Sequence, residues 1–199
     1  IPEILGTTEH YPHSQEVEKP TICPACGTPL QEIGAHLFCP NKLCTPRIVA
    51  ALDHYASKNA MNIDGFSEST AQQLVERKGV TKYSDLYRLT AEDLADLEGF
   101  KDKKVDNLLK SVENSKNAPF DKFIYALGIS NVGAKTAKDL AKNFDNLEDL
   151  RNASINRLIE IEDVGQIVAE SIVEFFANPK MQEEVSKLLK SSSVSELHS

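Results

Sequence analysis

The sequence predicts a mainly α-helical fold in which a small metal-binding module precedes a set of repeated helical hairpins. Four cysteines occur as two close pairs in the N-terminal part of the chain. Four short segments of the same form then begin 34, 32 and 32 residues apart. Each segment is followed by apolar residues at the i, i+3, i+4 spacing of an amphipathic helix. With 199 residues, of which 41% are hydrophobic, the chain can bury one or two modest cores.

The composition excludes several classes of protein. No apolar run approaches the ~20 residues that a membrane-spanning helix needs, and the sequence shows no secretory signal. The formal charge of −8 at pH 7 argues against a broadly basic surface. Any binding of nucleic acid must therefore use lysines that are grouped locally.

The N-terminal residues begin with a short apolar, strand-like run from Ile1 to Leu5 and continue as a polar stretch to Pro20. We expect residues 1–19 to be the end of an upstream domain and a linker.

The cysteine spacing predicts a structural zinc site. Cys23-x2-Cys26 is followed after twelve residues by Cys39-x4-Cys44, which leaves room for a β-hairpin that turns at Gly34. Four thiolates on two tight turns suit tetrahedral zinc and leave no coordination position for a catalytic water. Paired disulfides or buried thiols are the alternatives. His36 lies between the pairs, and we expect it to be solvated rather than a ligand.

A helix should follow the cysteines, because Thr45-Pro46 is typical of an N-cap and a first-turn proline. Ile48, Leu52 and Tyr55 recur along one face of this helix. We therefore assign residues 20–59 to a four-cysteine zinc finger with its connecting helix.

The repeated segments predict four units of helix, tight turn and helix. A longer period is also present, because the ten residues from Asp85 align without gaps with those from Asp149, and Thr90 and Ser154 both fall at N-cap positions. We expect two tandem units, roughly 60–116 and 123–178, within a domain of residues 60–190, and a disordered serine-rich tail at 191–199. The four segments are Ile63-Asp64-Gly65-Phe66, Leu97-Glu98-Gly99-Phe100, Ile129-Ser130-Asn131-Val132 and Ile161-Glu162-Asp163-Val164.

These segments match the helix-hairpin-helix pattern h-x-G-h-G, in which glycine adopts positive φ and lets an anion approach the backbone. Ordinary connections in a helical bundle are the alternative. No copy has both glycines. The first two copies keep the first glycine, with Ser67 and Lys101 at the second position, and the last two keep the second glycine, with Asn131 and Asp163 at the first. The four glycines that remain are Gly65, Gly99, Gly133 and Gly165.

The charged residues near each hairpin indicate which hairpins are the stronger candidates for binding phosphate. The second and third hairpins are followed by lysines, whereas acidic residues surround the fourth, and the first has no lysine until Lys78. We therefore expect the second and third hairpins to contact DNA through phosphate and minor groove, and Gly65 and Gly165 to contribute less. A merely solvated charged face is the alternative. The candidate lysines are Lys101, Lys103 and Lys104, with Lys110 nearby, and Lys135 and Lys138, followed by Lys142.

A nucleotide-binding P-loop is excluded at the third hairpin. Gly128 and Gly133 have the spacing of the two P-loop glycines, but Ala134 stands where the lysine is required.

The chain resembles the C-terminal half of bacterial NAD-dependent DNA ligases. The resemblance covers nearly the whole chain, and IPEIL resembles the last strand of that family's OB-fold domain. It is carried by CPACGTPL, FCPN, AMNIDGFSESTAQQL, DLYRLTAEDL, LEGF, ALGISNVGAKTA and VGQIVAESIVEFF.

The resemblance implies a cytoplasmic bacterial enzyme that seals nicks in duplex DNA during replication and repair, with NAD and Mg²⁺ as cofactors of the whole enzyme. The family's adenylated lysine lies in a K-x-D-G motif, and the nearest match here, Asn62-Ile63-Asp64-Gly65, lacks the lysine. We therefore expect no catalytic residue in this chain. It should be a monomeric part of the ligase that binds zinc and double-stranded or nicked DNA without ligating it.

Two other functions remain open from the sequence. One is a free-standing DNA repair or recombination protein that combines a zinc module with helix-hairpin-helix units and has no ligase activity. The other is a structural helical module that contacts protein.

Overall fold

A computed structural model describes residues 19–41 and 43–191. The chain divides into two compact units, Ile1–Lys42 and Leu43–Ser199. The predictions for residues 1–18 and for 192–199 lie outside the described residues. Within the described part of the chain, no helix has both the length and the apolar character that crossing a membrane requires.

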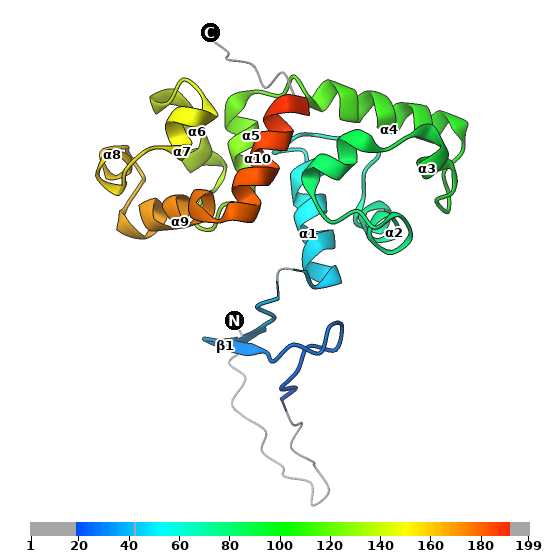
Figure 1. Cartoon of the computed structure of the whole chain (residues 1–199), viewed down its shortest axis with the longest axis horizontal. Helices are drawn as coiled ribbons and strands as arrows, with labels where there is room; N and C mark the ends of the chain where they lie inside the picture. Colours follow the sequence, from blue (N-terminus) through cyan, green and yellow to red (C-terminus); the bar gives the residue numbers. More distant parts are fainter. Residues whose placement is uncertain (1–18, 42, 192–199) are drawn as a thin grey trace, which may run out of the picture. The chain divides into compact units, whose positions relative to one another are not determined.

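The described elements are two short strands followed by helices (Figure 1). They are β1 (Gln31–Ile33), β2 (His36–Phe38), α1 (Thr45–Ala56), α2 (Glu68–Lys78), the 3-10 helix η1 (Tyr83–Arg88), α3 (Ala91–Ala95), α4 (Asp102–Ser115), α5 (Phe120–Ala126), α6 (Ala134–Asn143), α7 (Leu147–Arg151), α8 (Ile155–Ile159), α9 (Gln166–Ala177) and α10 (Pro179–Ser191).

The first unit contains the predicted β-hairpin. Strands β1 and β2 are antiparallel, and Ile33 pairs with His36 across the turn. Gly34 sits in this turn with φ of 60°, in the left-handed region that glycine adopts without strain. The prediction of a hairpin that turns at Gly34 is confirmed.

Helix α1 begins one residue earlier than we expected. Cys44 is the N-cap, so Thr45 is the first helical residue rather than the cap, and Pro46 lies in the first turn. Proline is tolerated there because the first N–H groups of a helix have no partner within the helix.

Helix α1 also lies on the other side of the expected domain boundary at residue 59. Its buried face includes Leu52 and Tyr55, which belong to the core of the helical unit. The helix packs against α2 and α5. The boundary between the compact units therefore falls before α1 rather than after it, because the apolar face of α1 is buried among the other helices.

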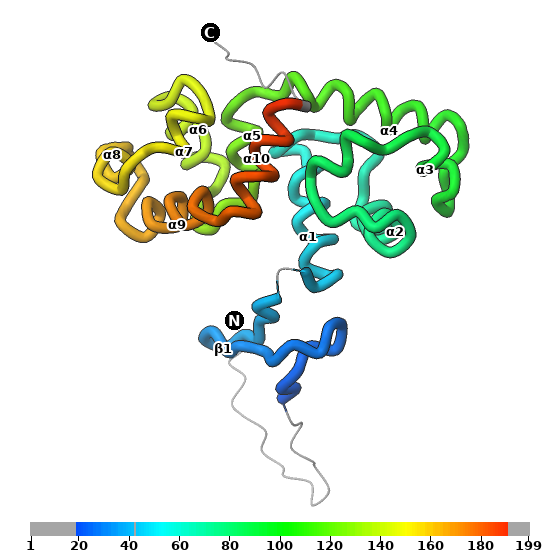
Figure 2. The backbone as a smooth tube through the Cα atoms, viewed as in Figure 1, coloured from blue at the N-terminus to red at the C-terminus, as the bar shows by residue number. Residues whose placement is uncertain are grey.

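The helical unit contains all four predicted helix–turn–helix repeats. The helix pairs are α1 with α2, α3 with α4, α5 with α6, and α8 with α9, and Figure 2 follows the backbone through the turns between them. The first residue of each turn segment fills the core: Ile63, Leu97, Ile129 and Ile161 are each only 3% exposed.

The longer repeat is confirmed as well. Helix α8 (Ile155–Ile159) starts and ends 64 residues after α3 (Ala91–Ala95). Thr90 caps α3 by accepting a hydrogen bond from the backbone N–H of Asp93 at 3.3 Å, and Ser154 accepts one from that of Arg157 at 3.2 Å. The same local chemistry therefore starts the equivalent helix in both tandem units.

Helix α10 joins the two tandem units, because it packs on α9 and on η1. Glu184 on α10 accepts hydrogen bonds from the backbone N–H of Ser84 at 2.7 Å and from its Oγ at 3.0 Å. Both residues are buried, at 4% and 3% exposed. Burial, and secondly the nearby Glu184 carboxylate, raise the pKa of Tyr83 to about 12.

Replacing Glu184 with alanine should lower the free energy of unfolding of the helical unit by about 3 kcal/mol, because two buried donors of Ser84 lose their acceptor. Glu184→Gln is the matched control. Its amide oxygen can accept from the Ser84 N–H and its amide nitrogen can donate to the hydroxyl, so about 1 kcal/mol should be lost. Urea unfolding measures both values. Equal losses in the two variants would contradict this account.

Candidate metal centre and nucleic-acid interface

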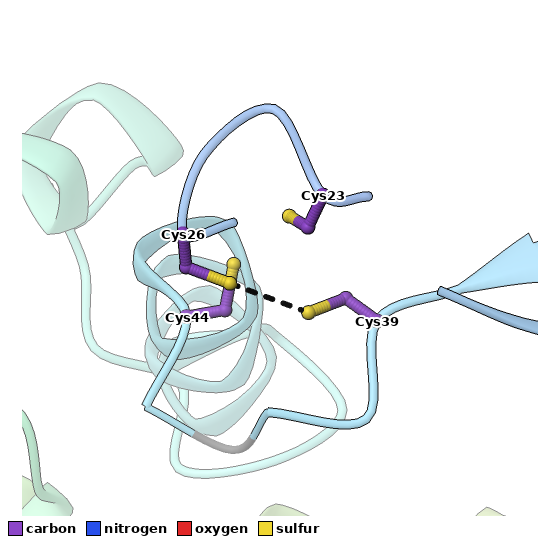
Figure 3. Close-up of side chains that lie close together, drawn as sticks. All are labelled: Cys23, Cys26, Cys39 and Cys44. Atoms are coloured by element: carbon purple, nitrogen blue, oxygen red, sulfur yellow. Dashed lines mark hydrogen bonds between the residues drawn. The ribbon is translucent and has the colours of Figure 1, made fainter. Parts of the chain in front are cut away.

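The four cysteines come together in one cluster (Figure 3). Their sulfurs all lie within 4.8 Å of one another, and Cys26 Sγ lies 3.6 Å from Cys39 Sγ. A tetrahedral zinc ion with Zn–S bonds of about 2.3 Å places its sulfurs about 3.8 Å apart, so a small contraction around the ion is sufficient. The separation of Cys26 and Cys39 is far longer than the about 2.05 Å of a disulfide bond. The cluster can therefore hold a metal ion such as zinc.

Tight backbone turns position these ligands. The N–H of Gly27 donates to the carbonyl of Cys23 at 2.8 Å, and Gly27 has φ of 73°. Hydrogen bonds from the side chain and backbone of Thr28, and then from the side chain of Asn41, lower the pKa of Cys26 to about 6. They favour the thiolate, which is the form that binds a metal. His36 is exposed on β2 and is not part of the cluster.

The first glycine position of each hairpin has a left-handed backbone. This position turns the chain between two helices, and asparagine and aspartate are the residues that tolerate it best after glycine. The sequence expectation for all four copies is confirmed. The φ values are 80° for Gly65, 81° for Gly99, 65° for Asn131 and 63° for Asp163.

The second glycine position has a different role. Ser67, Lys101, Gly133 and Gly165 are the N-caps of α2, α4, α6 and α9, and all four have negative φ. A side chain is therefore allowed there, and a Cβ at Gly133 would meet no atom within 4 Å. The absence of a side chain at Gly133 leaves the N-terminal N–H groups of α6 accessible to an anion.

A shallow groove of about 740 Å³ brings the first two hairpins together. Within the part of the chain that the structure describes, its four lysines form no ion pair with a carboxylate. Lys104 Nζ lies 4.3 Å from the centroid of the Phe100 ring. The groove is lined by Asp64, Gly65, Gly99, Lys101, Lys103, Lys104, Asn107, Lys110 and Ser111.

The groove makes Gly65 a stronger candidate for a phosphate contact than the sequence ranking did. The sequence ranking used only the charged residues close to each hairpin in the chain, and it placed Gly65 among the weaker candidates. In the structure Gly65 lines the same groove as Lys101, Lys103 and Lys104. The sequence around Gly65 does not show that the first hairpin lies beside the second, because that is a tertiary contact between two repeats.

The third hairpin is bonded to the fourth. Lys135 Nζ lies 2.5 Å from the Asp163 carboxylate, and Asn131 Nδ2 donates to Ser171 Oγ at 2.8 Å. Lys138 is exposed, and no ion pair joins it to a carboxylate of the described residues. Gly165 caps α9 next to Asp163 and lies outside the lysine-lined groove. The structure thus separates Lys135 from the other candidate lysines, because its charge is already paired.

The repeated helical hairpins and the cysteine cluster are those of a tandem helix-hairpin-helix protein with a four-cysteine site. Residues 57–114 match the model of a SAM-like helix-hairpin-helix tandem, and residues 122–185 match that of a helix-hairpin-helix motif. These ranges are close to the two tandem units predicted from the repeats. Helix-hairpin-helix motifs imply DNA binding.

The chain is also similar to DNA ligases from several bacteria. It is 50% identical over 192 residues to DNA ligase 1 of Clostridium acetobutylicum, which is 96% of this chain and 29% of that protein. It is 48% identical over 191 residues to the DNA ligase of Alkaliphilus oremlandii, covering 95% and 29% of the two proteins. For the DNA ligase of Clostridium tetani the identity is 46% over 192 residues, with 96% and 29% covered.

The chain spans about 29% of the length of these curated relatives. It therefore corresponds to a region of bacterial DNA ligase that contains helix-hairpin-helix motifs and a four-cysteine cluster.

Proposed function

We propose that this chain is the part of a cytoplasmic NAD-dependent DNA ligase that holds duplex DNA, without sequence specificity, while nicks are sealed. The observation that carries the proposal is the groove in which Gly65 and Gly99 lie beside Lys101, Lys103, Lys104 and Lys110. The four lysines, which have no carboxylate partner among the described residues, provide positive charge. The two left-handed glycine turns allow an anion to approach the backbone closely.

The groove suits phosphate better than base edges. Lysine side chains act as point charges that neutralise backbone phosphates, and such contacts fix the position of a protein on the duplex without reading its sequence. The open N-terminus of α6 at Gly133 offers a second phosphate contact. The formal charge of −8 for the whole chain fits weak and strongly salt-dependent binding, because only these local surfaces attract DNA.

The metal cluster has a structural role in this proposal. Four cysteine ligands fill a tetrahedral zinc and leave no position for a reacting water. Asn62 stands where a K-x-D-G motif would need its nucleophilic lysine, so the chain by itself does not ligate. NAD and Mg²⁺ are cofactors of the whole enzyme. The chain binds DNA as a monomer.

Fluorescence anisotropy with labelled nicked and intact duplexes at low salt tests the proposal. We expect both duplexes to bind, with the observed affinity falling steeply as salt rises. Absence of binding to either duplex, by a folded and metal-loaded chain, would overturn it.

The variant Gly133→Ser should weaken DNA binding about five-fold while changing the free energy of unfolding by less than about 0.5 kcal/mol. Ser67 shows the reason in the first hairpin, where its hydroxyl accepts a hydrogen bond from the Thr70 N–H at 3.2 Å. A serine at position 133 would use an N–H group of α6 in the same way and compete with the phosphate.

Gly165→Ser is the matched control, since Gly165 is the N-cap of α9 with almost the same backbone conformation and follows the acidic Glu162 and Asp163. It should leave DNA affinity unchanged. Equal losses in the two serine variants, or no loss in Gly133→Ser, would contradict a phosphate contact at the third hairpin.

A further inference from the structure

The contact between Lys135 and Asp163 links two hairpins that the sequence ranked very differently. Lys135 Nζ lies 2.5 Å from Asp163 Oδ2, and the two side chains are 78% and 40% exposed. Lys135 lies in the first turn of α6, next to the open N-terminus at Gly133. A DNA phosphate that approaches Gly133 therefore meets a lysine that is already bound to a carboxylate.

The backbone does not require aspartate at position 163. Asp163 and Asn131 occupy equivalent positions in the fourth and third hairpins, with φ of 63° and 65°. Asparagine and aspartate both tolerate this left-handed conformation, and glycine adopts it freely. The charge of Asp163 therefore adds something that the turn itself does not need.

Comparison with the second hairpin shows what the charge does. Lys103 lies two residues after the second glycine position, as Lys135 does, and within the described residues it forms no ion pair with a carboxylate. The hydrogen bond to Asp163 and the charge of that carboxylate raise the pKa of Lys135, and Asp139 and Glu162 add to the effect. Lys135 therefore stays protonated, and its positive charge is balanced by its acidic neighbours.

We propose that Asp163 is an internal competitor for DNA phosphate at the third hairpin, so that its carboxylate occupies Lys135 until a phosphate displaces it. This inference rests on the proposed DNA-binding function and adds a residue that sets its strength. An exposed ion pair is weak enough for a phosphate to break. Asp163 therefore reduces the affinity of the third hairpin and leaves the second hairpin as the stronger contact.

The test compares four variants in salt-dependent anisotropy with duplex DNA: Asp163→Asn, Lys135→Ala, the double variant, and Glu162→Gln. Asp163→Asn should bind about three-fold more tightly than the wild type, with a slope of log affinity against log salt that is steeper by up to about 0.9. Lys135→Ala alone should change the DNA affinity less than two-fold, because Lys135 is already paired with Asp163 in the wild type. In the double variant the gain should disappear.

Glu162→Gln is the matched charge control. It removes one negative charge from the neighbouring residue, but no hydrogen bond or ion pair of Glu162 to Lys135 is present among the described residues. It should therefore raise the affinity less than Asp163→Asn does. Asp163→Gly, which also tolerates positive φ, is the second variant if the asparagine variant does not fold.

Three outcomes would overturn the inference. Equal gains in Asp163→Asn and Glu162→Gln would show an effect of net charge alone. A gain that survives in the double variant would show that Lys135 is not involved, and no gain in either Asp163 variant would show that the carboxylate does not compete. These results leave the proposed function standing if the wild type binds DNA. Absence of binding by the wild type and all variants would overturn both.

Discussion

Replacing Cys23 with serine is expected to abolish metal binding and to unfold the first compact unit, while the helical unit stays folded. Cys23 is one of four sulfurs gathered within 4.8 Å, and the first unit has only two three-residue strands as regular structure within its described part. Its described apolar side chains include Ile22, Ile33 and Phe38, and these are exposed. A module with so small a core depends on its metal, and structural zinc supplies about 10–16 kcal/mol of apparent folding free energy in such modules.

The structure indicates where along the chain this unfolding should stop. The sequence assigns the whole connecting helix to the zinc finger of residues 20–59, so from the sequence alone the disorder would extend through that helix. Tyr55 is fully buried in the helical unit, where its hydroxyl lies 2.6 Å from that of Tyr87. Disorder should therefore stop near the start of α1 (Thr45–Ala56).

Elemental analysis and amide hydrogen exchange of the full chain measure both effects. The wild type should contain one equivalent of zinc, whereas Cys23→Ser should contain none and should exchange rapidly over residues 19–41. Ala25→Ser is the control, because it adds a hydroxyl to the same exposed turn and removes no ligand. Full retention of zinc in Cys23→Ser, or loss of protection throughout α1, would contradict the account.

The triple variant Lys101→Ala, Lys103→Ala and Lys104→Ala should bind duplex DNA at least about 30-fold more weakly than the wild type at low salt. These three lysines line the groove beside Gly65 and Gly99. Each phosphate contact contributes about 0.9 to the slope of log affinity against log salt, so the slope should fall by about 2 to 3. The three side chains are exposed, and the fold should be unaffected.

A charge-matched control separates this effect from net charge. Lys116, Lys180 and Lys187 lie outside the groove, and replacing all three with alanine removes the same formal charge. Anisotropy should show a loss of less than about three-fold for this control. If the two triple variants lose affinity equally, DNA binding depends on overall charge and the groove has no special role.

The turns and repeats could be predicted from the sequence because each depends on local chemistry. A left-handed position selects glycine, asparagine or aspartate, and this signal is enough to identify Gly65, Gly99, Asn131 and Asp163. The N-caps at Thr90 and Ser154 are also local features, because each hydroxyl accepts a hydrogen bond from a backbone N–H in the first turn of the helix that it caps. The cysteine cluster was predictable because metal geometry restricts the spacing of its ligands.

The remaining features depend on contacts between residues far apart in the chain. Nothing near Gly65 in the sequence indicates that it shares a groove with the lysines of the second hairpin. The pairing of Lys135 with Asp163 joins two repeats, and the bond between Ser84 and Glu184 spans 100 residues. Periodicity shows which side of a helix is buried and gives no information about what covers it. The same limit explains why α1 was assigned to the zinc module rather than to the helical core.

Amide hydrogen exchange of the chain with and without a nicked duplex would show which residues the DNA covers, and so whether the lysine-lined groove is its binding site. We expect slower exchange on DNA binding at residues 65–68 and 99–104, with a smaller effect at 131–136. Slower exchange elsewhere in the helical unit with no change at these three turns would contradict the proposed interface.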